Sequence, residues 1–162
     1  MTAKVVAIVQ ARMGSSRLPG KVLLPLGGRP VLWHVTQRLA AARSLDGTLI
    51  ATSVLPLDDA IADAAASWGV PWCRGSEGDV LDRYYQAACQ AAADVVVRLP
   101  ADKPLLHPGL VDEAVAEHLR VGADYTSNTP ADFPKGMTYP YGLEVEVVGF
   151  PALERAWREA TD

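Results

Sequence analysis

The sequence predicts an α/β fold with a mostly parallel sheet and helices on both faces. Apolar, β-branched segments alternate about four times with segments whose apolar residues recur at helical spacing. Residues 94–99 are so continuously apolar that we expect a central strand there. The 162 residues are 49% hydrophobic and 21% charged, which suits one domain with a buried core.

Strands are expected where β-branched and other apolar residues run together. The first, residues 4–10 (KVVAIVQ), is a buried run, whereas residues 142–150 (GLEVEVVGF) alternate between polar and apolar positions. Residues 129–140 carry prolines and Gly136 and are expected to be irregular. In chain order the expected strands are 4–10, 48–54, 70–73, 94–99, 123–127 and 142–150.

Helices are expected between these strands, bounded by proline and glycine. Pro30 and Pro151 open two of them, and Gly122 ends another. At the start of the second helix, Leu57 and Ile61 are expected to face inward. In chain order the expected helices are 30–42, 58–68, 79–92, 108–121 and 151–160.

Charge is distributed unevenly along a chain whose net charge is −4. Residues 1–45 hold seven cations and no acidic residue, whereas the rest holds 8 cations and 19 acidic residues. We therefore expect a small polyanion at one place rather than nucleic acid, which needs a broad basic face. The aliphatic run near the N-terminus, residues 5–9, is far shorter than the roughly 20 residues of a membrane span and is also too short for a signal-peptide core, so no membrane partner and a cytoplasmic location are expected.

The strongest chemical signal follows the first strand, at the start of a long loop expected over residues 11–28. The segment 10–21 (QARMGSSRLPGK) holds three cations, Arg12, Arg17 and Lys21, with two serines and two glycines. Glycines let backbone N–H groups approach phosphate closely, and arginine binds its oxygens bidentately. The spacing fits neither a Walker A motif nor a G-x-G-x-x-G fingerprint. It indicates a phosphate cradle of another kind; the alternative is a solvated surface loop.

Residues 10–35 (QARMGSSRLPGKVLLPLGGRPVLWHV) closely resemble the opening of the cytidylyltransferase-type nucleotide-sugar synthases. The nearest branch is the spore coat polysaccharide biosynthesis protein F family. Further matches are ATS at 51–53, RGSEGDVLDRY at 74–84, VVRLPADKP at 96–104 and YPYGLEVEV at 139–147. The resemblance implies a three-layer Rossmann-like nucleotide-diphospho-sugar transferase fold. It also implies one nucleotidyltransferase domain over 1–162 that lacks the C-terminal part of the family domain.

The resemblance implies transfer of CMP from CTP to a sugar or sugar-acid acceptor with release of pyrophosphate, by a homodimer, for surface polysaccharide. The acceptor oxygen attacks the α-phosphate in line, so catalysis is mainly positioning and charge neutralisation. Arg12, Lys21 and Asp102 are the implied catalytic residues. The implied nucleotide-binding residues are Ala11, Arg12, Met13, Gly14, Ser15, Ser16, Arg17, Lys21, Thr52, Ser53, Arg74, Gly75 and Ser76.

Asp102 is the implied ligand of Mg²⁺. A carboxylate just past a central strand, near phosphates, suits this metal, although Asp102 also fits an ordinary turn before Pro104. The family usually has glycine before this aspartate and a small or polar residue after it, where this chain has Ala101 and Lys103. Lys103 either pairs with Asp102 or contacts phosphate itself.

Tyr139, Glu144 and Glu146 are the implied acceptor-binding residues. Glu144 and Glu146 share one face of the expected strand and repel each other unless they meet cations or a metal, but a solvated face also fits. The resemblance places residues 74–77 near the base and ribose; the alternative is a helix start with Ser76 as its cap and Asp79 in the first turn. Two other functions stay open, namely a glycosyltransferase on the same scaffold and a non-catalytic nucleotide-binding protein.

Overall fold

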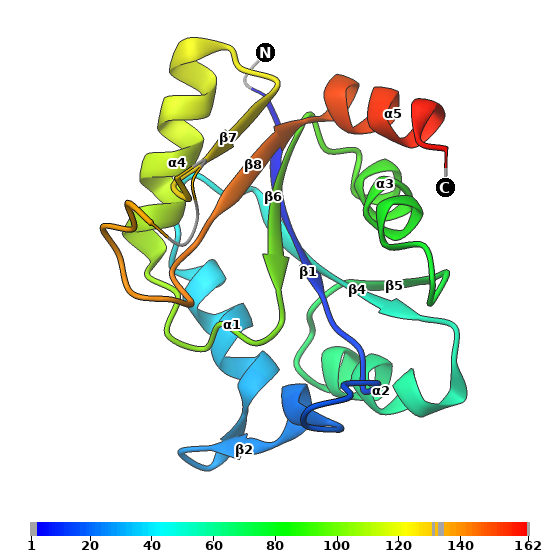
Figure 1. The fold of residues 1–162 in the computed structure, drawn as a ribbon. Helices are drawn as coiled ribbons and strands as arrows, with labels where there is room; N and C mark the ends of the chain where they lie inside the picture. Colours follow the sequence, from blue (N-terminus) through cyan, green and yellow to red (C-terminus); the bar gives the residue numbers. More distant parts are fainter. Residues whose placement is uncertain (1–2, 131, 133–134, 162) are drawn as a thin grey trace.

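A six-stranded sheet forms the centre of the computed structural model, which describes residues 3–130, 132 and 135–161 (Figure 1). The strands are β1 (Val5–Gln10), β4 (Gly47–Ser53), β5 (Trp72–Gly75), β6 (Val95–Pro100), β7 (Tyr125–Ser127) and β8 (Glu146–Gly149). Their order is β5-β4-β1-β6-β8-β7. The first four strands in this order are mutually parallel, β8 is antiparallel to β6, and β7 is antiparallel to β8. The predicted mostly parallel sheet and the central position of β6 are thus confirmed.

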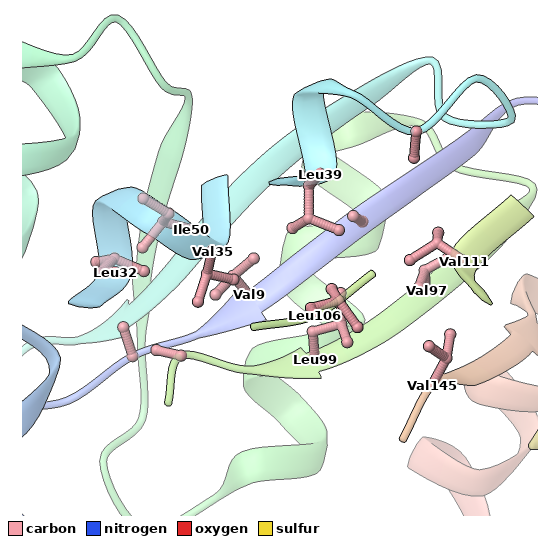
Figure 2. Close-up of a cluster of buried hydrophobic side chains, with 14 of the residues drawn as sticks. Val9, Leu32, Val35, Leu39, Ile50, Val97, Leu99, Leu106, Val111 and Val145 are labelled. Atoms are coloured by element: carbon pink, nitrogen blue, oxygen red, sulfur yellow. The ribbon is translucent and has the colours of Figure 1, made fainter. Parts of the chain in front are cut away.

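Helices cover both faces of the sheet, as predicted. They are α1 (Val31–Ala40), α2 (Asp59–Ser67), α3 (Val80–Ala91), α4 (Pro108–Val121) and α5 (Phe150–Glu159). One buried cluster joins α1, α2 and α4 to the sheet, and a second joins α3 and α5 to its other face. Figure 2 shows the first cluster, in which Leu32, Val35 and Leu39 of α1 lie against strand residues such as Val9. Within the described residues no helix is long and apolar enough to cross a membrane.

The segment 11–28 is more ordered than the long loop expected from its composition. It contains a 3₁₀ turn, η1 (Lys21–Leu23), and the first strand of a two-stranded antiparallel sheet, β2 (Pro25–Leu26) with β3 (Arg29–Pro30). Gly27 and Gly28 join the two strands with φ angles of 59° and 85°. A two-residue hairpin turn favours positive φ at both positions, which glycine adopts without strain.

Most element boundaries lie within about two residues of the sequence prediction, but several details at element ends differ from it. Leu57 is 62% exposed rather than inward-facing, because a 3₁₀ turn, η2 (Pro56–Asp58), precedes α2 and turns Asp58 inward instead. Asp79, not Ser76, caps α3 by accepting from the Asp82 N–H at 2.8 Å. β8 begins four residues later than expected, because the Asn128 side chain satisfies the Leu143 carbonyl and the Val145 N–H. Of the irregular segment 129–140, residues 131, 133 and 134 lie outside the described residues.

Candidate active site

A cavity of about 220 Å³ opens where β1 and β6 end side by side. Parallel strands present their carboxyl ends at one edge, so the loops that follow them meet there. The cavity is lined by Gln10, Arg12, Gly14, Ser15, Ser16, Arg17, Lys21, Val22, Pro100, Ala101 and Asp102. The structure therefore brings most of the phosphate loop, defined here as residues 11–21, together with Asp102. Ala11 is buried, and Met13 packs against the core rather than lining the cavity.

The phosphate loop closes on the backbone of Met13. The Met13 carbonyl accepts from the N–H groups of Ser15 and Gly20, both at 2.9 Å. Gly20 has a φ of 69°, and a Cβ added to it would lie 3.1 Å from the Met13 Cε. Both the backbone conformation and the close contact favour glycine at position 20, which keeps the loop in this closed form.

Asp58 anchors the phosphate loop to the end of β4. Its carboxylate is 2% exposed and accepts from the Met13 N–H at 2.7 Å, from the Ser53 N–H at 3.3 Å and from the Ser53 hydroxyl. The sequence does not single out Asp58 as a site residue. The available signal is its position: an acidic residue shortly after the second strand, at the edge where the loop after β1 begins.

Two of the three loop cations are paired with carboxylates. Lys21 forms an ion pair with Asp102, and Arg12 lies 3.3 Å from Glu77, which follows β5. Arg17 has no hydrogen-bond or ion-pair partner among the described residues. Glu77 belongs to the segment 74–77 that the resemblance places near the base and ribose, and its contact with Arg12 connects that segment to the phosphate loop. A polyphosphate entering this cavity would meet the guanidinium of Arg17, which has no partner among the described residues. It would also meet Arg12 and Lys21, which would leave their carboxylate partners to bind it.

Lys103 does not pair with Asp102, one of the two partners expected from the sequence, and its contact with phosphate stays a prediction. Its ammonium lies 2.9 Å from the Glu144 carboxylate and donates to the Glu144 carbonyl at 2.8 Å. Both side chains are only 15% exposed. Burial raises the pKa of Glu144, but hydrogen bonds from Lys103 and from the Gly142 N–H outweigh it and leave this pKa below its ordinary value.

The other predicted nucleotide-binding residues lie beside the cavity rather than in its lining. Thr52 and Ser53 are fully buried at the end of β4. Arg74 donates to the carbonyls of Ser53 and Leu55, each at 2.8 Å, and pairs with Asp59 at 2.6 Å. Ser76 accepts from the Asp79 N–H at 3.1 Å. Their contacts thus shape the segment after β5, and their binding roles stay predictions.

The three predicted acceptor residues are not gathered in one cavity. Glu146 pairs with Arg98 of β6 at 2.5 Å, and Glu144 pairs with Lys103. Each carboxylate therefore meets its own cation, which removes the repulsion expected between them. Tyr139 lines a separate cavity of about 170 Å³ between α4 and the end of β7.

A family model described as cytidylyltransferase matches residues 6–162. The chain belongs to the cytidylyltransferase family. It is 35% identical over 158 residues to the spore coat polysaccharide biosynthesis protein of Bacillus subtilis, covering 94% of this chain and 65% of that one. The chain thus spans just under two thirds of that relative's length.

Solved structures show the same fold. A cytidylyltransferase from Leptospira borgpetersenii superposes with a TM-score of 0.90 at 31% identity, over 99% of this chain and 66% of that one. A CTP complex of CMP:2-keto-3-deoxy-manno-octonic acid synthetase gives a TM-score of 0.77 at 19% identity, over 99% of this chain and 80% of that one. The three-layer fold expected for the family is confirmed.

Asp102 is the one carboxylate in the cavity lining. The described part of the chain holds no group of three histidine, cysteine, aspartate or glutamate side chains that could bind a metal. Mg²⁺ is commonly held by one or two carboxylates together with phosphate oxygens of the substrate and water. The hard oxygens of Asp102 beside the phosphate loop fit this kind of substrate-completed site.

Proposed function

We propose that the chain transfers CMP from CTP to a sugar or sugar-acid acceptor and releases pyrophosphate. The observation that carries this proposal is the cavity in which the cations of the phosphate loop face Asp102. Family membership and the CTP bound to a fold neighbour support it. A role in surface polysaccharide biosynthesis is part of the proposal, and the name of the Bacillus relative, which states spore coat polysaccharide biosynthesis for that protein, supports it.

In the proposed reaction the protein acts by binding and charge neutralisation. Arg12, Arg17 and Lys21 bind the triphosphate oxygens and neutralise the charge that develops on the departing pyrophosphate. The loop backbone, held closed on Met13, positions the α-phosphate for in-line attack by the acceptor oxygen. Asp102 would hold Mg²⁺, which supplies further neutralisation of phosphate charge when bound.

The test is thermal unfolding of the chain with CTP, UTP, ATP or GTP, each with and without Mg²⁺. A ligand that binds only the folded chain stabilises it by about 2.7 kcal/mol at 100 times its Kd. The expected result is a rise in Tm that is largest for CTP with Mg²⁺. The variant Arg120→Ala, which alters an exposed ion pair on α4, should behave like the wild type.

A rise with CTP would be followed by a pyrophosphate-release screen of acidic sugars. Pyrophosphate release that requires both CTP and one acceptor would support the transferase. CTP binding without release under any acceptor would favour a non-catalytic nucleotide-binding protein. UDP-glucose, added to the unfolding series as a preformed nucleotide sugar, tests the glycosyltransferase: a rise with it and with none of the four nucleotides would favour that function. No rise with any of these ligands would contradict the proposal. Light scattering of the same sample would test the expected homodimer.

A further inference from the structure

Arg83 of α3 is a buried cation with incomplete hydrogen bonding. Its residue exposure is 1%, and its Nη1 donates to the Ser76 carbonyl at 2.6 Å. Its Nε and Nη2 groups are buried and have no hydrogen-bond partner among the described residues. Buried guanidinium groups are ordinarily satisfied by several acceptors, so this arrangement requires an explanation.

The stability of the fold does not supply that explanation. Burying a charge and leaving donors unpaired both cost free energy, and apolar residues often replace such groups without loss of stability. No carboxylate among the described residues forms an ion pair with Arg83. Asp58 is occupied by Met13 and Ser53, and Glu77 by Arg12.

Arg83 is instead well placed to control the segment that follows β5. Gly75 packs so closely that a Cβ there would lie 3.3 Å from the Arg83 Cγ. The next residue, Ser76, is held through its carbonyl, and Glu77 contacts Arg12 in the cavity lining. A chain of contacts therefore connects the buried guanidinium to the phosphate loop.

The positive charge of Arg83 also acts on the region around Arg12 of the phosphate loop. Burial lowers the pKa of Arg83, and the positive charge of Arg12 lowers it further, whereas Tyr84, Asp58 and Glu77 raise it. An arginine guanidinium nevertheless stays protonated in proteins. Arg83 thus adds a fixed positive charge near Arg12, in a region where burial weakens solvent screening.

We propose that Arg83 is a positioning residue of the nucleotide site, which holds residues 75–77 beside Arg12 and adds positive charge behind the phosphate loop. Arg83 itself lies outside the cavity lining, so we expect it to act through residues 75–77 and Arg12. The inference rests on the proposed function, because it assumes that a polyphosphate binds there. The unpaired donors of Arg83 are then explained by its role in ligand binding and not by a contribution to folding stability.

The test compares Arg83→Met, which keeps the length of the side chain and removes its charge, with Arg83→Lys, which keeps the charge. Urea denaturation without ligand measures stability, and calorimetry with Mg²⁺ measures the Kd of CTP and of inorganic pyrophosphate. For Arg83→Met we expect an unchanged or higher urea midpoint and affinities for both ligands weakened about 10-fold, as for one partly buried charge. Arg83→Lys should recover most of the pyrophosphate affinity.

Arg120→Met serves as the matched control, since Arg120 is an exposed arginine paired only within α4. A lower urea midpoint for Arg83→Met would overturn the inference, whether or not affinity changes, because it would make Arg83 a stabilising residue of the core. Unchanged affinities would overturn it as well. If the wild type bound neither CTP nor pyrophosphate, the proposed function itself would fail, and this inference with it.

Discussion

The nucleotide side and the expected acceptor side of the site use their charged residues differently. On the nucleotide side, Arg12, Arg17, Lys21 and Asp102 line one cavity, and Arg17 is free of partners among the described residues. On the acceptor side, Glu144 and Glu146 are each paired with a cation from the segment formed by β6 and the loop after it. On the nucleotide side the charged residues line a cavity and one cation is unpaired among the described residues, whereas on the acceptor side both ion pairs join the segment around β8 to β6 and the loop after it. A charged residue near a site is therefore informative only once its partner is known.

The largest expected effect tests whether the nucleotide side depends on one buried carboxylate. Asp58→Ala leaves the Met13 N–H, the Ser53 N–H and the Ser53 hydroxyl without their acceptor. Because each unsatisfied buried donor costs about 1–3 kcal/mol, we expect the free energy of unfolding to fall by about 3 kcal/mol or more. Urea denaturation measures this change. Asp59→Ala, in the next position, removes an exposed ion pair and should cost less than about 1 kcal/mol; equal losses for the two variants would contradict the anchoring role of Asp58.

An intermediate effect compares one lysine from each side. Lys21→Ala should weaken CTP binding by about 1.5–3 kcal/mol, since a hydrogen bond to a charged group is lost. Lys103→Met should leave CTP affinity unchanged and reduce stability instead, because it leaves Glu144 without its cation. Calorimetry and urea denaturation of both variants measure the two quantities. A loss of CTP affinity in Lys103→Met similar to that of Lys21→Ala would show that the two sides are not separate.

The smallest expected effect is a pH dependence on the acceptor side. The pKa of Glu144 is below its ordinary value in the folded chain, so the unfolded chain binds this proton more readily. Its contribution to stability is fully present above the ordinary glutamate pKa of about 4.3 and is lost as pH falls through the lower folded value. We expect the stability difference between wild type and Glu144→Gln, under about 1 kcal/mol at pH 7, to shrink in acid. A stability difference between the two proteins that stays constant with pH would show that it does not arise from the lowered pKa of Glu144.

Much of the fold could be predicted because its elements are encoded locally. The β-branched run of β1 is enough to predict that strand. In the same way, the proline and the glycine that bound α4 predict the start and the end of that helix. The start of β8 was not predictable in this way. It depends on the Asn128 side chain, which replaces the backbone partners of Leu143 and Val145 from another part of the chain.

The site was predictable to the extent that it follows from strand order. Residues 11–21 and Asp102 meet because β1 and β6 are parallel neighbours that end at one edge. Asp58 was missed because its importance depends on a contact with Met13, which lies far away in the sequence. No local pattern distinguishes this carboxylate from a solvated one. For the same reason, the ion pair between Lys103 and Glu144 could not be predicted from the sequence.

The position of β8 inside the sheet also has a consequence for how the chain folds during synthesis. Among the described residues, β8 follows every other strand in the sequence, yet it lies between β6 and β7 and is the strand that pairs with β7. A nascent chain that ends before Glu146 therefore has no strand on which β7 can pair. Pairing between segments distant in sequence is slow. β7 can therefore join the sheet only after residues 146–149 have been synthesised.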